Sequence, residues 1–338
     1  MTYRKKNWTR RGFLVFLGAG MSLGASELRS YATNKSPKKI SQTETFIAKI
    51  DSYNQDIAGA ILAGFQELGV KKDEIQGKRI LLKPNLVETQ IGAEHINTHP
   101  LVIRGAIEAF LHLGAAQVLV GEAPGHRRDT LLVLEESGLG EILLEDRIKF
   151  VDLNYDDFYT VANGGGYAKR LPKLTFPATL KQVDWIVSMP KLKTHHWTGV
   201  TLSMKNLFGV MPGIVYGWPK NPLHWAGIEN SILDINATIK PNFAIVDGII
   251  GMEGDGPIMG TPRPVGAIAM GRNLLAVDAT CSRIMGINPE KIGYLATADG
   301  FLGLIQEKQI KQRGETIASV KKDFFLLENI PAFQKLQN

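Results

Sequence analysis

The sequence predicts an α/β fold, with a largely parallel, open sheet, helices on both faces and one hairpin-like excursion. Short apolar runs typical of buried strands alternate with segments whose apolar residues recur at helical spacing. A helical crossover between two strands returns the second strand in the direction of the first, which favours parallel pairing. Several expected strands also end in a polar residue beside glycine or proline. Ligands bind at such strand ends in open parallel sheets.

The alternation is clearest in the first part of the fold. A helix is expected over 57–68, where apolar residues recur every three or four positions and Gly69 ends the pattern. A buried strand over 79–82 follows. The next helix begins at Pro100 and ends near Gly114, and it leads into a strand over 117–120.

The remaining elements are expected in the same way. The segment 155–177, with three successive glycines at its middle, predicts the hairpin-like excursion. One domain should span 46–330. Its further strands are expected at 148–153, 185–188, 243–246, 267–270 and 274–277, and its further helices at 131–136, 228–239 and 279–285.

Residues 1–32 predict a twin-arginine signal peptide, and 33–45 a polar linker. A basic stretch containing Arg10 and Arg11 precedes an uncharged stretch over 12–26, and small residues follow at 30–32. A retained anchor is the alternative, but about 15 apolar residues rich in glycine are short for a membrane span. We therefore expect export by the twin-arginine translocation machinery to a periplasmic or other extracytoplasmic location, with membrane contact only through the signal segment.

The net charge of +6 does not predict a nucleic-acid partner. Six of the 39 basic residues and one of the 33 acidic residues lie in 1–32, which leaves 33 basic and 32 acidic residues in the rest of the chain. The excess charge therefore belongs to the leader, and nucleic acid is not expected as a partner.

The chain has a single cysteine, Cys281. It can form neither an intramolecular disulfide nor a Cys-ligated iron–sulfur cluster within this chain. Its apolar neighbours predict the packed face of a helix; a reactive thiol is the alternative. No Gly-x-Gly-x-x-Gly follows a strand, so a dinucleotide cofactor is not indicated.

Basic and amide side chains cluster after two expected strands. Several ammonium groups beside one imidazole suit a small anionic substrate such as a carboxylate or phosphate. A solvated basic loop is the alternative, but Trp197, Leu207 and Phe208 lie among the charges. His224 is either a ligand-binding residue or a structural residue beside Trp225. The expected catalytic residues are His195 and Lys193, and the expected anion-binding residues are Lys83, Asn85, Lys191, Lys205, Asn206 and His224.

Acidic residues form a second group among glycines, at Asp247, Glu253 and Asp255. This spacing allows the backbone to turn the carboxylates toward one divalent metal ion. Asp278, after the expected strand 274–277, is a further candidate. An ordinary turn is the alternative, because aspartate and glycine favour turns regardless of function.

Several separated motifs together resemble one family. They are Leu81-Leu82-Lys83-Pro84-Asn85, Thr98-His99-Pro100, Pro190-Lys191-Leu192-Lys193-Thr194-His195, Met204-Lys205-Asn206-Leu207-Phe208-Gly209, and Val246-Asp247-Gly248 with Glu253-Gly254-Asp255-Gly256-Pro257. Over about 78–300 the chain resembles the bacterial and archaeal family of domain of unknown function 362. Some members look fused to ferredoxin-like cluster domains, which implies a redox link for them. The family name implies no activity.

Two hypotheses of different class follow. In the first, the protein is an exported enzyme for a small anionic substrate, in which lysines hold the anion, His195 moves a proton and the acidic group holds a metal ion or orients the base. In the second, the same crevice binds an anionic ligand or cofactor without converting it, as a carrier or assembly factor. A redox-associated role is the weakest alternative. Both main hypotheses require the basic and acidic groups to share one pocket.

Overall fold

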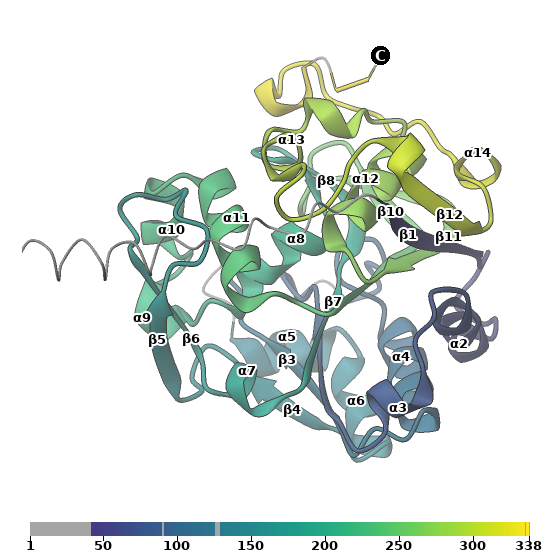
Figure 1. Ribbon diagram of the computed structural model, residues 1–338, viewed down its shortest axis with the longest axis vertical. Helices are drawn as coiled ribbons and strands as arrows, with labels where there is room; N and C mark the ends of the chain where they lie inside the picture. The colour runs from purple at the N-terminus through teal and green to yellow at the C-terminus, as the bar shows by residue number, and fades with distance from the viewer. Residues whose placement is uncertain (1–41, 90, 126–128, 335, 338) are drawn as a thin grey trace, which may run out of the picture. The chain divides into compact units, whose positions relative to one another are not determined.

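The computed structural model describes residues 42–89, 91–125, 129–334 and 336–337. In these residues ten strands form the main sheet (Figure 1). The expected signal peptide lies outside these residues. A short antiparallel pair, β8 (Lys191–His195) and β9 (Gly199–Thr201), joins the sheet through β10. Along the sheet the order is β12 (Ile310–Gly314), β1 (Thr43–Lys49), β11 (Thr261–Gly271), β10 (Phe243–Glu253), β7 (Trp185–Met189), β2 (Arg79–Pro84), β3 (Gln117–Glu122) and β4 (Lys149–Asp152).

The sheet is mostly parallel, as predicted. Parallel pairing joins neighbouring strands in the order β4, β3, β2, β7 and β10. β11 runs antiparallel to both of its neighbours, β10 and β1. The fold begins earlier than expected, because β1 starts at Thr43, inside the segment predicted to be a linker. The segment is short and half polar, so its sequence does not indicate a strand. It becomes one because it pairs with both β11 and β12.

Helices cover both faces of the sheet, because successive residues of each strand point to opposite sides. In β2, Ile80 and Leu82 belong to one hydrophobic core and Leu81 to the other. The first core includes residues of α2 (Ile57–Glu67), α3 (Lys72–Ile75), α4 (Pro100–His112), α5 (Thr130–Glu136) and α6 (Leu139–Glu145). The second includes residues of α8 (Ser203–Asn206), α11 (Ile228–Ile239), α12 (Leu274–Ile284) and α13 (Gly293–Ala298). No helix within the described ranges is long and apolar enough to cross a membrane.

The predicted strand at 274–277 is wrong. This run is the first turn of α12, where the Asn273 side chain accepts a hydrogen bond from the Ala276 amide at 2.9 Å and caps the helix. Four buried apolar residues do not distinguish a strand from a helix turn. The Asp278 carboxylate accepts the amides of Ser203 and Met204 at 2.7 and 2.9 Å. Cys281 is buried on the same helix, as predicted.

The hairpin-like excursion is present as an antiparallel pair, β5 (Phe158–Ala162) and β6 (Lys173–Pro177). Asp234 of α11 holds the loop between them, because its carboxylate accepts the amides of Tyr167 and Ala168 at 2.8 Å each. The shorter elements are α7 (Thr179–Gln182), η1 (Leu207–Val210), α9 (Gly213–Tyr216), α10 (Asn221–Trp225), η2 (Pro289–Lys291), η3 (Glu307–Gln309), α14 (Ile317–Val320) and η4 (Pro331–Phe333).

β8 and the second half of β10 are not expected from the sequence. β8 carries two lysines and a histidine, yet all five of its residues are buried. β10 continues past Asp247 through a bulge between Gly248 and Ile250 to Glu253. Gly248 and Gly251 therefore belong to a bulged strand, whereas Gly254 and Gly256 lie in the turn that follows it.

Candidate anion-binding site

A cavity of about 140 Å³ lies at the carboxyl ends of β2 and β3, where β8 and the turns after β9 close over it. Seven of the residues predicted from the sequence line it: Lys83, Asn85, Lys193, His195, Lys205, Asn206 and His224. Glu122, Thr201, Phe208, Gly209 and Lys220 also contribute. The position agrees with the rule that ligands bind at the carboxyl ends of parallel strands.

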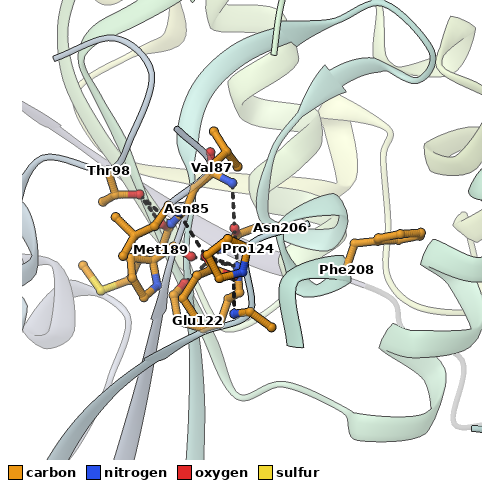
Figure 2. A network of polar contacts seen from close by, with 12 residues as sticks. Asn85, Val87, Thr98, Glu122, Pro124, Met189, Asn206 and Phe208 are labelled. Atoms are coloured by element: carbon orange, nitrogen blue, oxygen red, sulfur yellow. Dashed lines mark hydrogen bonds and ion pairs between the residues drawn. The ribbon is translucent and has the colours of Figure 1, made fainter. Parts of the chain in front are cut away.

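A buried ion pair forms the floor of the cavity. The Lys83 ammonium lies 2.7 Å from a carboxylate oxygen of Glu122, and both side chains are at most 2% exposed. The same ammonium donates to the Asn206 side-chain oxygen at 2.9 Å and to the Pro84 carbonyl at 2.8 Å. Figure 2 shows Glu122, Asn206 and Asn85 together in this network. Burial lowers the pKa of Lys83, and the charge of Glu122 opposes that shift.

Two polar atoms of the cavity wall have no partner within the described part of the chain. The amide of Asn206 donates to the Lys83 carbonyl at 2.9 Å, which turns its oxygen toward the Asn85 amide nitrogen at 3.2 Å. The Asn85 oxygen is consequently left without a donor, and the Thr201 hydroxyl is also unpaired. Buried polar atoms are rarely unpaired in folded proteins. Both atoms are therefore available to a bound molecule.

Lys193 and Lys220 extend their ammonium groups along the cavity wall. Lys193 donates to the carbonyls of Ile96 and Pro257 at 2.9 and 3.1 Å, and Lys220 donates to those of Ala123 and Phe208 at 2.7 and 3.2 Å. Neither has a carboxylate within ion-pair distance among the described residues. Burial lowers the pKa of Lys220 to about 7 and that of Lys193 well below its ordinary value, with neighbouring lysines adding to both shifts.

Lys220 has no signal in the sequence that could have identified it. It lies between two prolines and adopts a left-handed backbone conformation, with φ of 69° and ψ of 45°. This conformation is uncommon for a residue with a side chain. Such strain occurs often at functional sites, but only the coordinates reveal it.

The Lys205 ammonium is the least constrained of the cavity. It lies over the Phe208 ring, 4.7 Å from its centroid. Among the described residues no acceptor is within hydrogen-bonding distance of it. Burial, followed by the charge of Lys83, lowers the pKa of Lys205 to about 8. Its amine therefore exchanges a proton near neutral pH.

His195 is oriented by the backbone. Its Nδ1 accepts the Trp197 amide at 3.1 Å. Burial and then the charge of Lys205 lower the pKa of His195 well below its ordinary value, so the ring is neutral. A neutral imidazole that accepts at Nδ1 carries its proton on Nε2. His195, which lines the cavity, thus carries a hydrogen-bond donor at Nε2. His224 lies against Phe208 and Trp197 at centroid distances of 5.2 and 5.4 Å.

Lys191 and Asp247 do not belong to this cavity. They form an ion pair of 2.5 Å in which both side chains are fully buried. The Tyr53 hydroxyl lies 3.0 Å from the Lys191 ammonium, and the Asp247 carboxylate accepts the His99 amide at 2.9 Å. Burial lowers the pKa of Lys191, although Asp247 opposes the shift. Lys191 and Asp247 thus connect β8 to β10, and neither is among the residues that line the cavity.

The three predicted metal ligands have separate partners. Glu253 accepts the Phe325 amide at 2.9 Å and lies 3.6 Å from the Arg263 guanidinium. Asp255 lies 3.7 Å from His196. Asp247 is occupied by Lys191. In the described ranges no group of three or more histidine, cysteine, aspartate or glutamate residues is arranged to hold a metal ion. The predicted acidic residues neither come together nor line the cavity, so the shared pocket expected from the sequence is not formed as predicted. The carboxylate beside the basic cluster is instead that of Glu122.

Comparisons with known proteins identify a family and a relative whose names state no activity. The family model described as a domain of unknown function (DUF362) matches residues 80–283. A protein of Synechocystis sp. named as thylakoid-associated is 28% identical over 257 residues, which cover 72% of this chain and 75% of the relative. A crystal structure of a Thermotoga maritima protein aligns with a TM-score of 0.39 at 14% identity, covering 70% of this chain and 60% of that one. The match thus spans less than two thirds of the Thermotoga protein.

Proposed function

This chain belongs to the family described as domain of unknown function 362, and we propose that it is an enzyme acting on a small anionic substrate. The observation that carries the proposal is the excess of positive charge around one cavity. Lys83, Lys193, Lys205 and Lys220 line it. The carboxylate of Glu122 pairs with Lys83. Three buried or half-buried amines thus have no counter-ion among the described residues.

An anion supplies what this arrangement lacks. Burying like charges together is unfavourable unless opposite charge accompanies them. The pKa values of about 8 for Lys205 and about 7 for Lys220 express that penalty. A bound carboxylate or phosphate would favour the charged form of each lysine. Its binding would therefore be coupled to proton uptake by the protein.

The chemistry that the cavity supports is proton transfer and polarisation. The Nε2–H of His195 is available to a substrate oxygen, because Nδ1 is engaged by Trp197. Lys205 exchanges a proton near neutral pH. A group whose pKa lies near the working pH is the most effective general acid or base. These two residues therefore give the site a catalytic as well as a binding capacity.

Calorimetric titration of the purified protein with oxalate, inorganic phosphate and pyruvate tests the proposal. At least one of these anions should bind, and Lys205→Met and Lys220→Met should each weaken binding by about tenfold or more, equivalent to about 1.4 kcal/mol. Lys72→Met, an exposed lysine on α3, is the matched control. Equal affinities in all four proteins would contradict the assignment. A small anion that binds at this site and is only ever released unchanged would favour the carrier or assembly role.

We also propose that the protein is exported by the twin-arginine machinery to an extracytoplasmic location. The adjacent Arg10 and Arg11 before an uncharged stretch over 12–26 support this. Arg10→Lys with Arg11→Lys should leave full-length protein in the cytoplasm, as measured by cell fractionation and immunoblotting. Normal export of that variant would contradict the proposal. Export followed by recovery in the membrane fraction would indicate a retained anchor.

A further inference from the structure

We propose that the Lys205 amine attacks the carbonyl carbon of the substrate and forms a covalent imine, so that the substrate is a 2-oxo acid or a similar anionic carbonyl compound. This inference rests on the proposed function and names the substrate class of the same cavity.

The first support is the contrast between Lys205 and the other lysines of the cavity. Each of the others donates to two or three oxygens: Lys83 to three, Lys193 to two and Lys220 to two. Those acceptors hold their ammonium groups in place. Lys205 has no such acceptor within the described residues, and its ammonium lies over the Phe208 ring. Its nitrogen is therefore free to approach a bound molecule.

The second support is the availability of the neutral amine. An amine must lose its proton before it can act as a nucleophile. Lowering the pKa of Lys205 from 10.5 to about 8 raises its neutral fraction near pH 7 by about 300-fold. Burial and the charge of Lys83 cause the shift. Desolvation beside another cation is a recognised way of activating a lysine.

The third support is the set of groups around that amine. Lys193 and Lys220 are placed to hold a carboxylate, and the Nε2–H of His195 is free to donate to the carbonyl oxygen. The Thr201 hydroxyl, unpaired and buried, is available to the hydroxyl group of the intermediate. A molecule with a carboxylate beside a carbonyl group uses both kinds of contact.

The reaction balances without an oxidant or reductant. The nitrogen lone pair forms the carbon–nitrogen bond while the carbonyl π pair moves to oxygen. Nitrogen then loses one proton and oxygen gains one, which gives a carbinolamine. Loss of its hydroxyl group with the second nitrogen proton releases water and leaves the imine. The protonated imine attracts electrons from the adjacent carbon.

Reductive trapping tests this inference. The full chain is incubated with pyruvate and sodium cyanoborohydride near neutral pH, and adducts are located by intact-mass and peptide mass spectrometry. One carboxyethyl group should be found on Lys205, formed about tenfold or more faster than on the exposed Lys72. The advantage is smaller than the gain in neutral fraction, because an amine with a lower pKa is intrinsically a weaker nucleophile. Equal labelling of the two lysines, or preferential labelling of Lys193 or Lys220, would overturn the inference.

Lys205→Arg separates this inference from the proposed function. Arginine keeps the positive charge but cannot form the imine, so pyruvate binding should persist within a few-fold while trapping at position 205 disappears. The covalent step would be refuted if pyruvate bound the natural protein and Lys220→Met weakened that binding, but no adduct formed in the natural protein. The proposal of a small anionic substrate would then still stand. Absence of both binding and adduct for the whole anion set would refute both.

Discussion

Removing Lys191 should destabilise the fold without affecting anion binding. Lys191→Met leaves the Asp247 carboxylate fully buried and without its cation. The amides of His99 and Ile249 and the Tyr53 hydroxyl remain as donors, at 2.9 to 3.3 Å. Breaking a buried pair by removing one partner typically lowers the free energy of unfolding by about 3–5 kcal/mol. The three remaining donors place the expected loss near the lower end of that range.

A double-mutant cycle isolates the pair. Asp247→Asn should cost less than Lys191→Met, because the remaining lysine can release its proton; its pKa is already lowered by burial. The double variant Lys191→Met/Asp247→Asn contains no buried charge at this position and should be less destabilised than the sum of the single variants, by about 2 kcal/mol. Urea unfolding, followed by tryptophan fluorescence, gives each free energy.

The surface pair of Lys78 and Asp184 provides the control. Its atoms lie 3.6 Å apart and its side chains are 43% and 42% exposed. Lys78→Met should change the free energy of unfolding by about 1 kcal/mol or less. A loss for Lys191→Met no larger than that of this control would contradict the structural role of the buried pair. Weakened oxalate binding would contradict it too, since Lys191 would then contribute to the cavity.

Three further predictions concern the cavity and the buried thiol. Oxalate affinity should fall as pH rises through about 7 and then about 8, because Lys220 and then Lys205 lose the protons whose charge holds the anion. Calorimetry over a pH series should show proton uptake on binding. An affinity that rises over this range would contradict the assignment. Gly209→Ala should weaken oxalate binding, because a Cβ there would collide with Glu122 and the Lys83 ammonium, and unchanged binding would show that the pair can shift without consequence. Cys281 should react with a thiol reagent only on unfolding, since burial raises its pKa well above the ordinary value, and rapid labelling of the native protein would disprove this.

The sequence predicts the fold and much of the cavity because both depend on local rules. Apolar periodicity distinguishes the long helices from the strands, and polar residues at strand ends indicate where a crevice forms. Lys83 is the next-to-last residue of β2 and Asn85 follows the strand directly, and Asn206 contacts both side chains. The strand ends and their order along the chain suffice for that prediction.

The errors come from pairings between distant segments. Lys191 and Lys193 are two residues apart on β8, so the sequence gives them the same role. The register of β8 against β10 sets Asp247 opposite Lys191, and the bulge that follows brings Met252, an apolar residue, opposite Lys193. That bulge also carries Glu253 toward Arg263. No local pattern encodes the register of two strands more than fifty residues apart.

Partnership with a carboxylate divides the buried lysines of this protein into two classes. Lys83 and Lys191 each face an acidic side chain across a strand boundary, and each pair connects neighbouring strands of the sheet. Lys193, Lys205 and Lys220 face carbonyl groups or an aromatic ring instead, and their lowered pKa values show that the fold bears unfavourable charge there. Unpaired charge of this kind is expected where function requires it rather than where folding does. An anion that binds only the folded state would offset that penalty and raise the stability of the protein in proportion to its occupancy.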